Sequence, residues 1–180
     1  MTTIRHATSA DLPQAADLAV LHSGGERPHW QARFAEELVR PGSCLLIADS
    51  RGRVAGYGRV RRFDPSPHGP ANLAPAGYYL GGIVVDPAHR RQGIGEQLTR
   101  ARMAWTAPLA SEIWYFTNAG NQASLRLHRR LGFREVTRDF TYPGVAFTGG
   151  IGVLCRAPLV SEDSEGATGP SDLPGSQLPG

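Results

Sequence analysis

The stretch Gly82-Ile83-Val84-Val85-Asp86-Pro87-Ala88-His89-Arg90-Arg91-Gln92-Gly93-Ile94-Gly95 decides the fold, because a buried strand ends in it and a glycine-bearing turn opens a helix. The first amides of a helix have no intrahelical acceptor, and the helix dipole adds about half a positive charge at that end. Gly93 and Gly95 allow this backbone to approach a ligand closely. The turn therefore predicts a binding site for an anion such as pyrophosphate.

Two other nucleotide-binding motifs fit this stretch less well. The segment Gly93-Ile94-Gly95-Glu96-Gln97-Leu98 begins like the dinucleotide fingerprint but has leucine where the third glycine belongs. A Walker-type phosphate loop needs a lysine, and all 19 basic residues of this chain are arginine. A lone Gly-x-Gly before a helix is most often ordinary turn chemistry, so the assignment depends on the rest of the chain.

Hydrophobic periodicity and turn residues predict the elements on either side of the turn. Strands are expected over residues 4–7, 44–48, 54–60, 78–85, 112–117, 133–141 and 150–156. Helices are expected over residues 11–21, 30–39, 94–105 and 122–131, the last with Ala123, Leu127 and Leu131 facing inward. This alternation predicts an α/β fold in which helices cover both faces of a mixed sheet.

Two segments have loop composition. Residues 63–76 contain four prolines and are predicted to form a long loop between two strands, and loops of this length are often functional. Residues 161–180 are rich in Ser, Gly, Pro and acidic residues and contain almost no large apolar side chains, which predicts disorder. The chain is thus expected to form one domain over residues 1–157, followed by an acidic tail over 158–180.

The composition of the 180 residues, with 41% hydrophobic and 19% charged residues, is typical of a soluble globular protein. No stretch is long and apolar enough for a membrane span, and no signal-peptide pattern opens the chain, so a cytoplasmic location is expected. Cys44 and Cys155 lie in apolar runs and are expected to be buried thiols, with neither a disulfide framework nor a metal site.

The net charge of +3 is unevenly distributed. Residues 161–180 contain four acidic residues and no arginine, so the remaining residues carry a net charge of +7. A basic body favours anionic ligands. The arginines are scattered and form no long tract with interleaved aromatic residues, so nucleic acid is not a favoured partner.

The sequence Arg90-x-x-Gly93-x-Gly95, after the Val-Asp-Pro strand end, resembles the acetyl-CoA-binding signature of the GNAT superfamily of N-acetyltransferases. A second segment, Asn121-Gln122-Ala123-Ser124-Leu125-Arg126-Leu127-His128-Arg129-Arg130-Leu131-Gly132-Phe133, is similar to that family's Asn-x-x-Ala-x-x-Leu-Tyr-x-x-x-Gly-Phe pattern. The resemblance covers about residues 3–157. Within the superfamily, the chain looks loosely like actinobacterial aminoglycoside-type members. It implies a GNAT-like fold, with a mostly antiparallel sheet of about six to seven strands and about four helices.

The resemblance also implies which residues bind acetyl-CoA. Strand residues Ile83, Val84 and Val85 would offer backbone groups to the pantetheine arm. The turn would hold the pyrophosphate through Arg90, Arg91, Gln92, Gly93, Ile94 and Gly95, with Arg90 either pinning the loop or meeting a phosphate. Asn121 and Ser124 would reach the cysteamine end, although Asn121 is equally well placed to cap a helix.

The catalytic residues are less sharply defined. His128 stands where many family members have the tyrosine that protonates the departing thiolate, and a histidine with an ordinary pKa near 6.5 can serve as an acid. Packing is the competing role for His128. Tyr79 is expected to belong either to the active-site wall or to the core. The general base stays open, with candidates in the early helical region at His22, Glu26, His29 and Glu36.

The function expected from the resemblance is transfer of an acetyl group from acetyl-CoA to a primary amine of a small molecule or peptide, in a ternary complex and without a metal. The alternative is a CoA-binding sensor without turnover, which is suggested by the absence of the tyrosine and of a carboxylate in the strand before Asp86. The identity of the acceptor and the formation of a homodimer are left open by the sequence.

Overall fold

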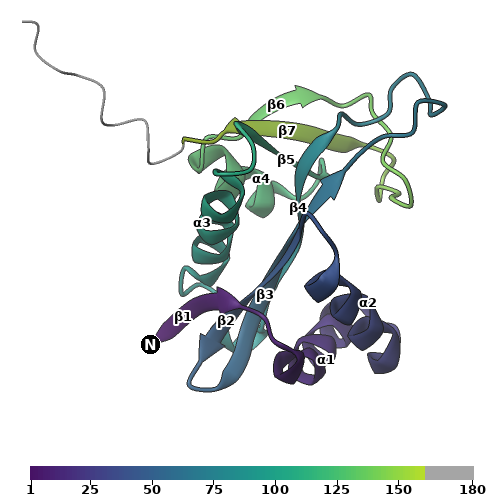
Figure 1. The fold of residues 1–180 in the computed structure, drawn as a ribbon. Coiled ribbons are helices and arrows are strands. Elements are labelled where there is room, and N and C mark those ends of the chain that lie inside the picture. Colours follow the sequence, from purple (N-terminus) through teal and green to yellow (C-terminus); the bar gives the residue numbers. More distant parts are fainter. Residues whose placement is uncertain (161–180) are drawn as a thin grey trace, which may run out of the picture.

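The computed structural model describes residues 1–160 of the chain, which form one sheet with helices on both sides (Figure 1). The strands are β1 (Thr2–His6), β2 (Ser43–Ser50), β3 (Arg53–Phe63), β4 (Gly77–Val85), β5 (Glu112–Asn118), β6 (Arg134–Thr137) and β7 (Gly152–Pro158). The α-helices are α1 (Leu12–Ser23), α2 (Arg27–Val39), α3 (Ile94–Thr106) and α4 (Gln122–Arg130), and short 3-10 helices η1 (Ser9–Asp11) and η2 (Pro87–His89) precede α1 and α3. The numbers of strands and of α-helices agree with the fold expected from the sequence.

The sheet has the order β1-β2-β3-β4-β5-β7-β6, and every neighbouring pair is antiparallel except β4 and β5. The parallel pairing of β4 with β5 is limited to Tyr79 opposite Trp114 and Leu80 opposite Tyr115. Beyond Leu80 the two strands diverge, while β4 stays paired with β3 as far as Val85. One edge of β4 therefore lacks a strand partner in the middle of the sheet.

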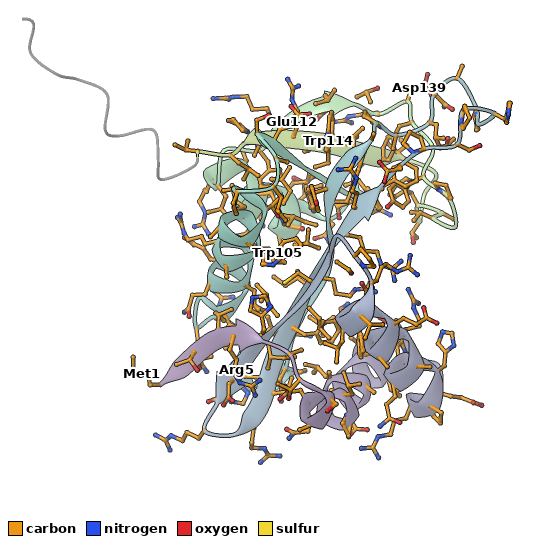
Figure 2. The ribbon with its side chains drawn as sticks, in the orientation of Figure 1. Met1, Arg5, Trp105, Glu112, Trp114 and Asp139 are labelled. Carbon is orange, nitrogen blue, oxygen red and sulfur yellow. The ribbon has the colours of Figure 1, made fainter. Side chains whose placement is uncertain are left out.

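Two apolar cores lie on opposite faces of the sheet. One core packs α3 and α4 on the sheet through residues such as Leu98 and Tyr115, and Trp105 lies between α3 and the sheet, 6.0 Å from Tyr78 between ring centroids (Figure 2). The other core packs α1 and α2 through Leu45, Phe34 and their neighbours. This layered packing holds the divergent strands in place from both sides.

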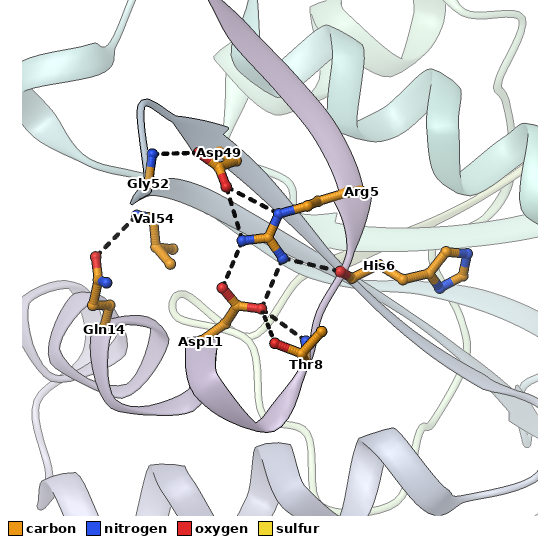
Figure 3. Close-up of polar contacts among 8 residues, drawn as sticks. All are labelled: Arg5, His6, Thr8, Asp11, Gln14, Asp49, Gly52 and Val54. Carbon is orange, nitrogen blue, oxygen red and sulfur yellow. Dashed lines mark hydrogen bonds and ion pairs between the residues drawn. The ribbon is translucent and has the colours of Figure 1, made fainter.

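A polar network fixes the start of the domain (Figure 3). Arg5 on β1 donates to both carboxylate oxygens of Asp11 at 2.8 and 2.7 Å, and its Nε and Nη2 also donate to Asp49 on β2. Asp11 in turn accepts from the backbone amide and the hydroxyl of Thr8, which closes a capping box at the entry to η1. The bond from Arg5 lowers the pKa of Asp11 to about 2.

Several sequence expectations need correction. The expected strand 133–141 is limited to β6 because Asp139 donates its amide to the side chain of Thr137 and turns the chain away. On α4, Ala123 is exposed instead of inward, and the buried residue within the helix is His128. Leu127 and Leu131 pack on the core as expected. The long loop between β3 and β4 is confirmed at residues 64–76. The expected disordered tail lies almost wholly outside the described residues.

Within residues 1–160, the helices are too short or too polar to cross a membrane. In the same residues, His, Cys, Asp and Glu side chains nowhere gather in threes as a metal site would require. Both cysteines are free and buried, as expected from their apolar surroundings.

Candidate functional site

A cavity of about 470 Å³ lies where β4 and β5 diverge, which is within the usual range for a small-molecule site. Its walls come from both faces of the sheet, because Tyr115 belongs to the core under α3 and Tyr79 to an aromatic cluster on the other side. The cavity therefore passes through the gap between the strands. Its lining comprises His22, Arg33, Arg59, Arg61, Tyr79, Leu80, Gly81, Gly82, Ile83, Arg102, Tyr115, Phe116, Thr117, Asn121, Ser124, His128, Tyr142, Pro143, Gly144 and Val145.

Three polar side chains meet on the α4 side of the cavity. The hydroxyls of Tyr115 and Ser124 lie 2.6 Å apart, a distance at which either can donate. The ring of His128 stacks on that of Tyr115 with centroids 3.6 Å apart and planes inclined by 5°. The predicted residues His128 and Ser124 are thus brought together, and Tyr115 on β5 joins them through a contact that sequence spacing does not reveal.

The environment of His128 opposes its charged form. The side chain is 2% exposed, and burial lowers its pKa to about 4, while the hydrogen bond to the Ser124 backbone acts in the other direction. Nδ1 lies 2.9 Å from the carbonyl oxygen of Ser124, which can only accept, so Nδ1 carries the proton of the neutral ring. Nε2 is then an acceptor, buried and without a partner in the described part of the chain. Participation of His128 in catalysis stays a prediction, but the one proton of the neutral ring is held by the Ser124 carbonyl and Nε2 has none to donate.

The turn before α3 has the backbone geometry that an anion site requires. Gly93 lies in the left-handed region with φ 78°, and Arg91 also has a positive φ of 61°. The helix begins at Ile94, so the amides of its first turn face the approach to the helix without intrahelical acceptors. A Cβ at Gly93 would meet no atom closer than 3.7 Å, which leaves open space above the turn. These features fit a bound pyrophosphate.

Arg90 pins this turn to the end of β4. Its Nε donates to the carbonyl oxygen of Val85 at 3.3 Å, one of the two roles expected from the sequence. The backbone of Ile83, Val84 and Val85 is paired with β3 on one side and has no strand on the other. This free edge runs from the cavity toward the turn and is available to an extended ligand arm.

Asn121 and Tyr79 each combine a structural contact with a place on the cavity wall. The side-chain oxygen of Asn121 accepts from the amide of Ser124 at 3.2 Å and so caps α4. Tyr79 is 2% exposed, and its hydroxyl donates to the carbonyl oxygen of Pro75 at 2.7 Å. Burial raises the pKa of Tyr79, so this phenol stays protonated. A catalytic role for Tyr79 stays a prediction.

The four candidates for a general base are dispersed. Only His22, at the end of α1, lines the cavity. Glu26 precedes α2 as its exposed N-cap residue, His29 is exposed, and Glu36 lies 3.8 Å from Arg40 on the surface.

Sequence reasoning missed a buried arginine at the centre of the site. Arg102 on α3 is 0% exposed, and burial lowers its pKa to about 9. Its Nη1 donates to the carbonyl oxygens of Arg59 and Gly81 at 3.2 and 3.0 Å, which ties α3 to β3 and β4 where the gap opens. Gly58 makes room for this side chain, since a Cβ there would stand 3.1 Å from Nε of Arg102. A glycine in a strand is the only sequence signal of this close approach.

Comparisons with known proteins agree with this geometry. The model of the acetyltransferase (GNAT) family matches residues 10–133. A mycothiol acetyltransferase from Pseudarthrobacter chlorophenolicus is 31% identical over 112 residues, which are 62% of this chain and 33% of that protein. The chain spans about a third of the length of the curated relatives it matches.

Solved structures share the fold. A ribosomal-protein-alanine N-acetyltransferase from Brucella melitensis is 25% identical and superposes with a TM-score of 0.66, covering 87% of this chain and 99% of that one. A phosphinothricin acetyltransferase from Sinorhizobium meliloti, solved in complex with acetyl-CoA, is 22% identical with a TM-score of 0.66, over 95% of this chain and 94% of that one. The fold predicted from the sequence is thereby confirmed.

Proposed function

The chain belongs to the GNAT family of acetyltransferases, and we propose that it transfers the acetyl group of acetyl-CoA to a primary amine of a small molecule or peptide. The observation that carries this proposal is the cavity between β4 and β5, which reaches both faces of the sheet. Such a cavity allows a donor and an acceptor to meet from opposite sides. Direct transfer within a ternary complex needs no covalent intermediate on the protein.

The donor half of the cavity is the α3 and α4 side together with the turn at Arg90–Gly95. The amides at the start of α3 and the open space above Gly93 support a pyrophosphate at this turn. The unpaired edge of Ile83–Val85 supports an extended pantetheine arm that leads from the turn to the gap. When bound there, acetyl-CoA would supply the thioester that is attacked.

Tyr115 is the best-placed proton donor for the departing sulfur. Burial raises the pKa of its phenol, so the proton is present at neutral pH. The hydroxyl of Ser124 at 2.6 Å can orient it or share its proton. The neutral ring of His128 stacks on Tyr115 and holds it in place, which favours the packing role over the acid role, the two alternatives that the sequence left open for His128.

The acceptor half of the cavity is the side formed by α1, α2, β3 and the loop between β6 and β7. No carboxylate from the described residues lines it. The amine therefore enters in its neutral form or loses its proton to water or to His22, which is the only one of the four base candidates on the wall. Once neutral, the amine nitrogen attacks the carbonyl carbon, the carbon–sulfur bond breaks, and the proton of Tyr115 goes to the sulfur. The proton that the nitrogen loses on becoming an amide returns through water to Tyr115.

The test measures acetyl-CoA binding by calorimetry and thiol release with a panel of amino acids, peptides, polyamines and aminoglycosides. Tyr115→Phe should lower the maximal rate by about a hundredfold, the usual contribution of a general acid, with acetyl-CoA affinity changed by less than about twofold. His128→Phe retains the stacked aromatic ring and should lower the maximal rate less than Tyr115→Phe does. Binding without thiol release on any amine would support the CoA-sensor alternative and overturn the transferase.

A further inference from the structure

The acceptor half of the cavity is strongly cationic. Arg33 on α2 and both Arg59 and Arg61 on β3 line it, whereas within residues 1–160 no acidic side chain does. Arg33 lies over the ring of Trp30 at 4.9 Å and has no ion pair with a described carboxylate. Like charges gathered in a partly enclosed site repel one another, so this arrangement indicates that a negative partner enters.

Glu37 holds the two strand arginines from behind the cavity wall. Its Oε1 lies 3.2 Å from Nη1 of Arg59 and 2.6 Å from Nη2 of Arg61, and its other oxygen accepts from the hydroxyl of Ser43. Burial alone would raise the pKa of Glu37, but the bonds from Arg61 and Ser43 and the charges of both arginines lower it. One fixed carboxylate thus orients two guanidinium groups and neutralises only one of them.

Arg59 keeps one nitrogen of its guanidinium free. Nη1 is bonded to Glu37, Nη2 donates to no acceptor among the described residues, and Nε is unpaired but buried. Nη2 is therefore the group of Arg59 that can donate a charge-assisted hydrogen bond to an entering carboxylate or phosphate. Arg59 is largely buried, and this burial lowers its pKa, so an anion at Nη2 would offset the cost of keeping the charge there.

Two glycines on β4 create the space beside this guanidinium. A Cβ at Gly81 would stand 3.1 Å from Cβ of Arg59 and 3.5 Å from its Nε, and a Cβ at Gly82 would stand 3.6 Å from its Nη2. Any side chain at these positions would crowd or cover the guanidinium. The glycines lie directly after Leu80, where β4 leaves β5, so the guanidinium lies beside the point where the transfer is proposed to occur.

The phosphates of acetyl-CoA are not the expected partner of this group. The turn at Arg90–Gly95 follows the far end of β4, and Val85 is five residues beyond Leu80. Gly82, which stands beside Arg59, is three residues before Val85, so at about 3.3 Å per residue the arginine lies about 10 Å along the strand from the start of the turn. The arginines flank the opposite, acceptor half of the cavity.

We propose that the acceptor is a small amine that carries a carboxylate or phosphate a few bonds from its nitrogen, as an amino acid does, and that Arg59 and Arg61 bind this anionic group. The proposal rests on the proposed acetyl transfer and names its substrate class. It disfavours polycationic acceptors such as aminoglycosides, because their ammonium groups would face three arginines without a carboxylate.

The test uses reaction products, whose binding needs no turnover. The CoA-bound protein is titrated with N-acetylglycine, N-acetyl-L-alanine and N-acetyl-L-glutamate, each paired with its carboxamide, and with N-acetylated phosphoethanolamine to separate phosphate from carboxylate. In at least one pair the acid should bind about tenfold more tightly than the amide, the usual value of a charge-assisted hydrogen bond. Equal or weaker binding of the acid in every pair, together with no binding of the phosphate compound, would overturn the proposal.

A matched pair of variants assigns the preference to the arginines. Arg61→Gln should reduce the preference for the acid to less than about threefold. Arg62→Gln is the control, because Arg62 is the next residue on β3, faces the opposite side of the sheet, and pairs with exposed Asp64. If both variants keep the preference for the acid over the amide, the assignment of anion binding to these arginines is wrong. Failure of the transferase itself would appear separately, as absent thiol release with unchanged product binding.

Discussion

Replacing His128 by phenylalanine should remove a specific part of the acid sensitivity of the fold. His128 is 2% exposed and its pKa is lowered to about 4, whereas the unfolded chain restores the ordinary value of 6.5. As the pH falls from 6.5 to 4, the unfolded state therefore binds a proton at His128 that the folded state does not bind. The free energy of unfolding falls in that window and is not lowered further by this group below it.

The size of the effect follows from the two pKa values. At about 1.4 kcal/mol per pH unit, the difference between 6.5 and about 4 is worth about 3 kcal/mol. Urea unfolding at pH values from 7.5 to 4 measures it, with the slope against urea checked for constancy. The wild type should lose about 3 kcal/mol more than His128→Phe over this range. Any packing cost of the larger ring is the same at every pH and cancels in the comparison.

The control is His68→Phe, because His68 lies exposed in the loop between β3 and β4. This variant should follow the wild-type pH dependence. If His128→Phe also runs parallel to the wild type within about 0.5 kcal/mol, His128 titrates normally in the folded protein. The argument that it is neutral, and with it the assignment of the acid to Tyr115, would then be refuted.

Three further predictions concern the turn before α3, the polar network around Asp11, and the two buried cysteines. Gly93→Val should abolish acetyl-CoA binding measured by calorimetry, whereas Gly52→Val, which strains an equally left-handed residue (φ 79° against 78°) in a distant turn, should leave it intact. Asp11→Asn should lower the unfolding free energy at pH 7 by about 2 kcal/mol, and because the folded pKa of Asp11 is depressed, this difference should shrink as the pH falls from about 4 toward 2. Cys44 and Cys155 are buried with pKa values raised to about 11, so both should react with a disulfide reagent at pH 8 only after denaturation.

The parts of the fold that sequence could predict are those determined by local patterns. The switch from strand to helix at Val85–Ile94 was visible because a short apolar run, a glycine turn and a helical period follow one another directly. The Pro-rich loop was visible for a similar reason, since four prolines in fourteen residues exclude a regular element. In each case the residues that decide the structure are close together in the chain.

Predictions failed where burial depends on a distant partner. The period of α4 predicted Ala123, Leu127 and Leu131 inward. Leu127 and Leu131 do pack on the core, but Ala123 is exposed, and the buried side chain within the nine-residue helix is His128, which packs on Tyr115 and Phe133. Apolarity alone would rank leucine and alanine above histidine for such a place. The flat contact with Tyr115, from another strand, decided the orientation instead, and no local pattern carries that information.

The cationic acceptor half shows the same limit most clearly. Glu37 sits in a helix next to Glu36, so the sequence gives no reason to bury one glutamate and expose the other. The distinction arises because β3 brings two arginines from more than twenty residues away onto the same carboxylate. A lone buried carboxylate would be costly, but one that meets two guanidinium groups is stabilised and in turn fixes their direction. The charge of the cavity is therefore a property of the assembled sheet, and only the adjacent glycines Gly81 and Gly82 mark its place in the sequence.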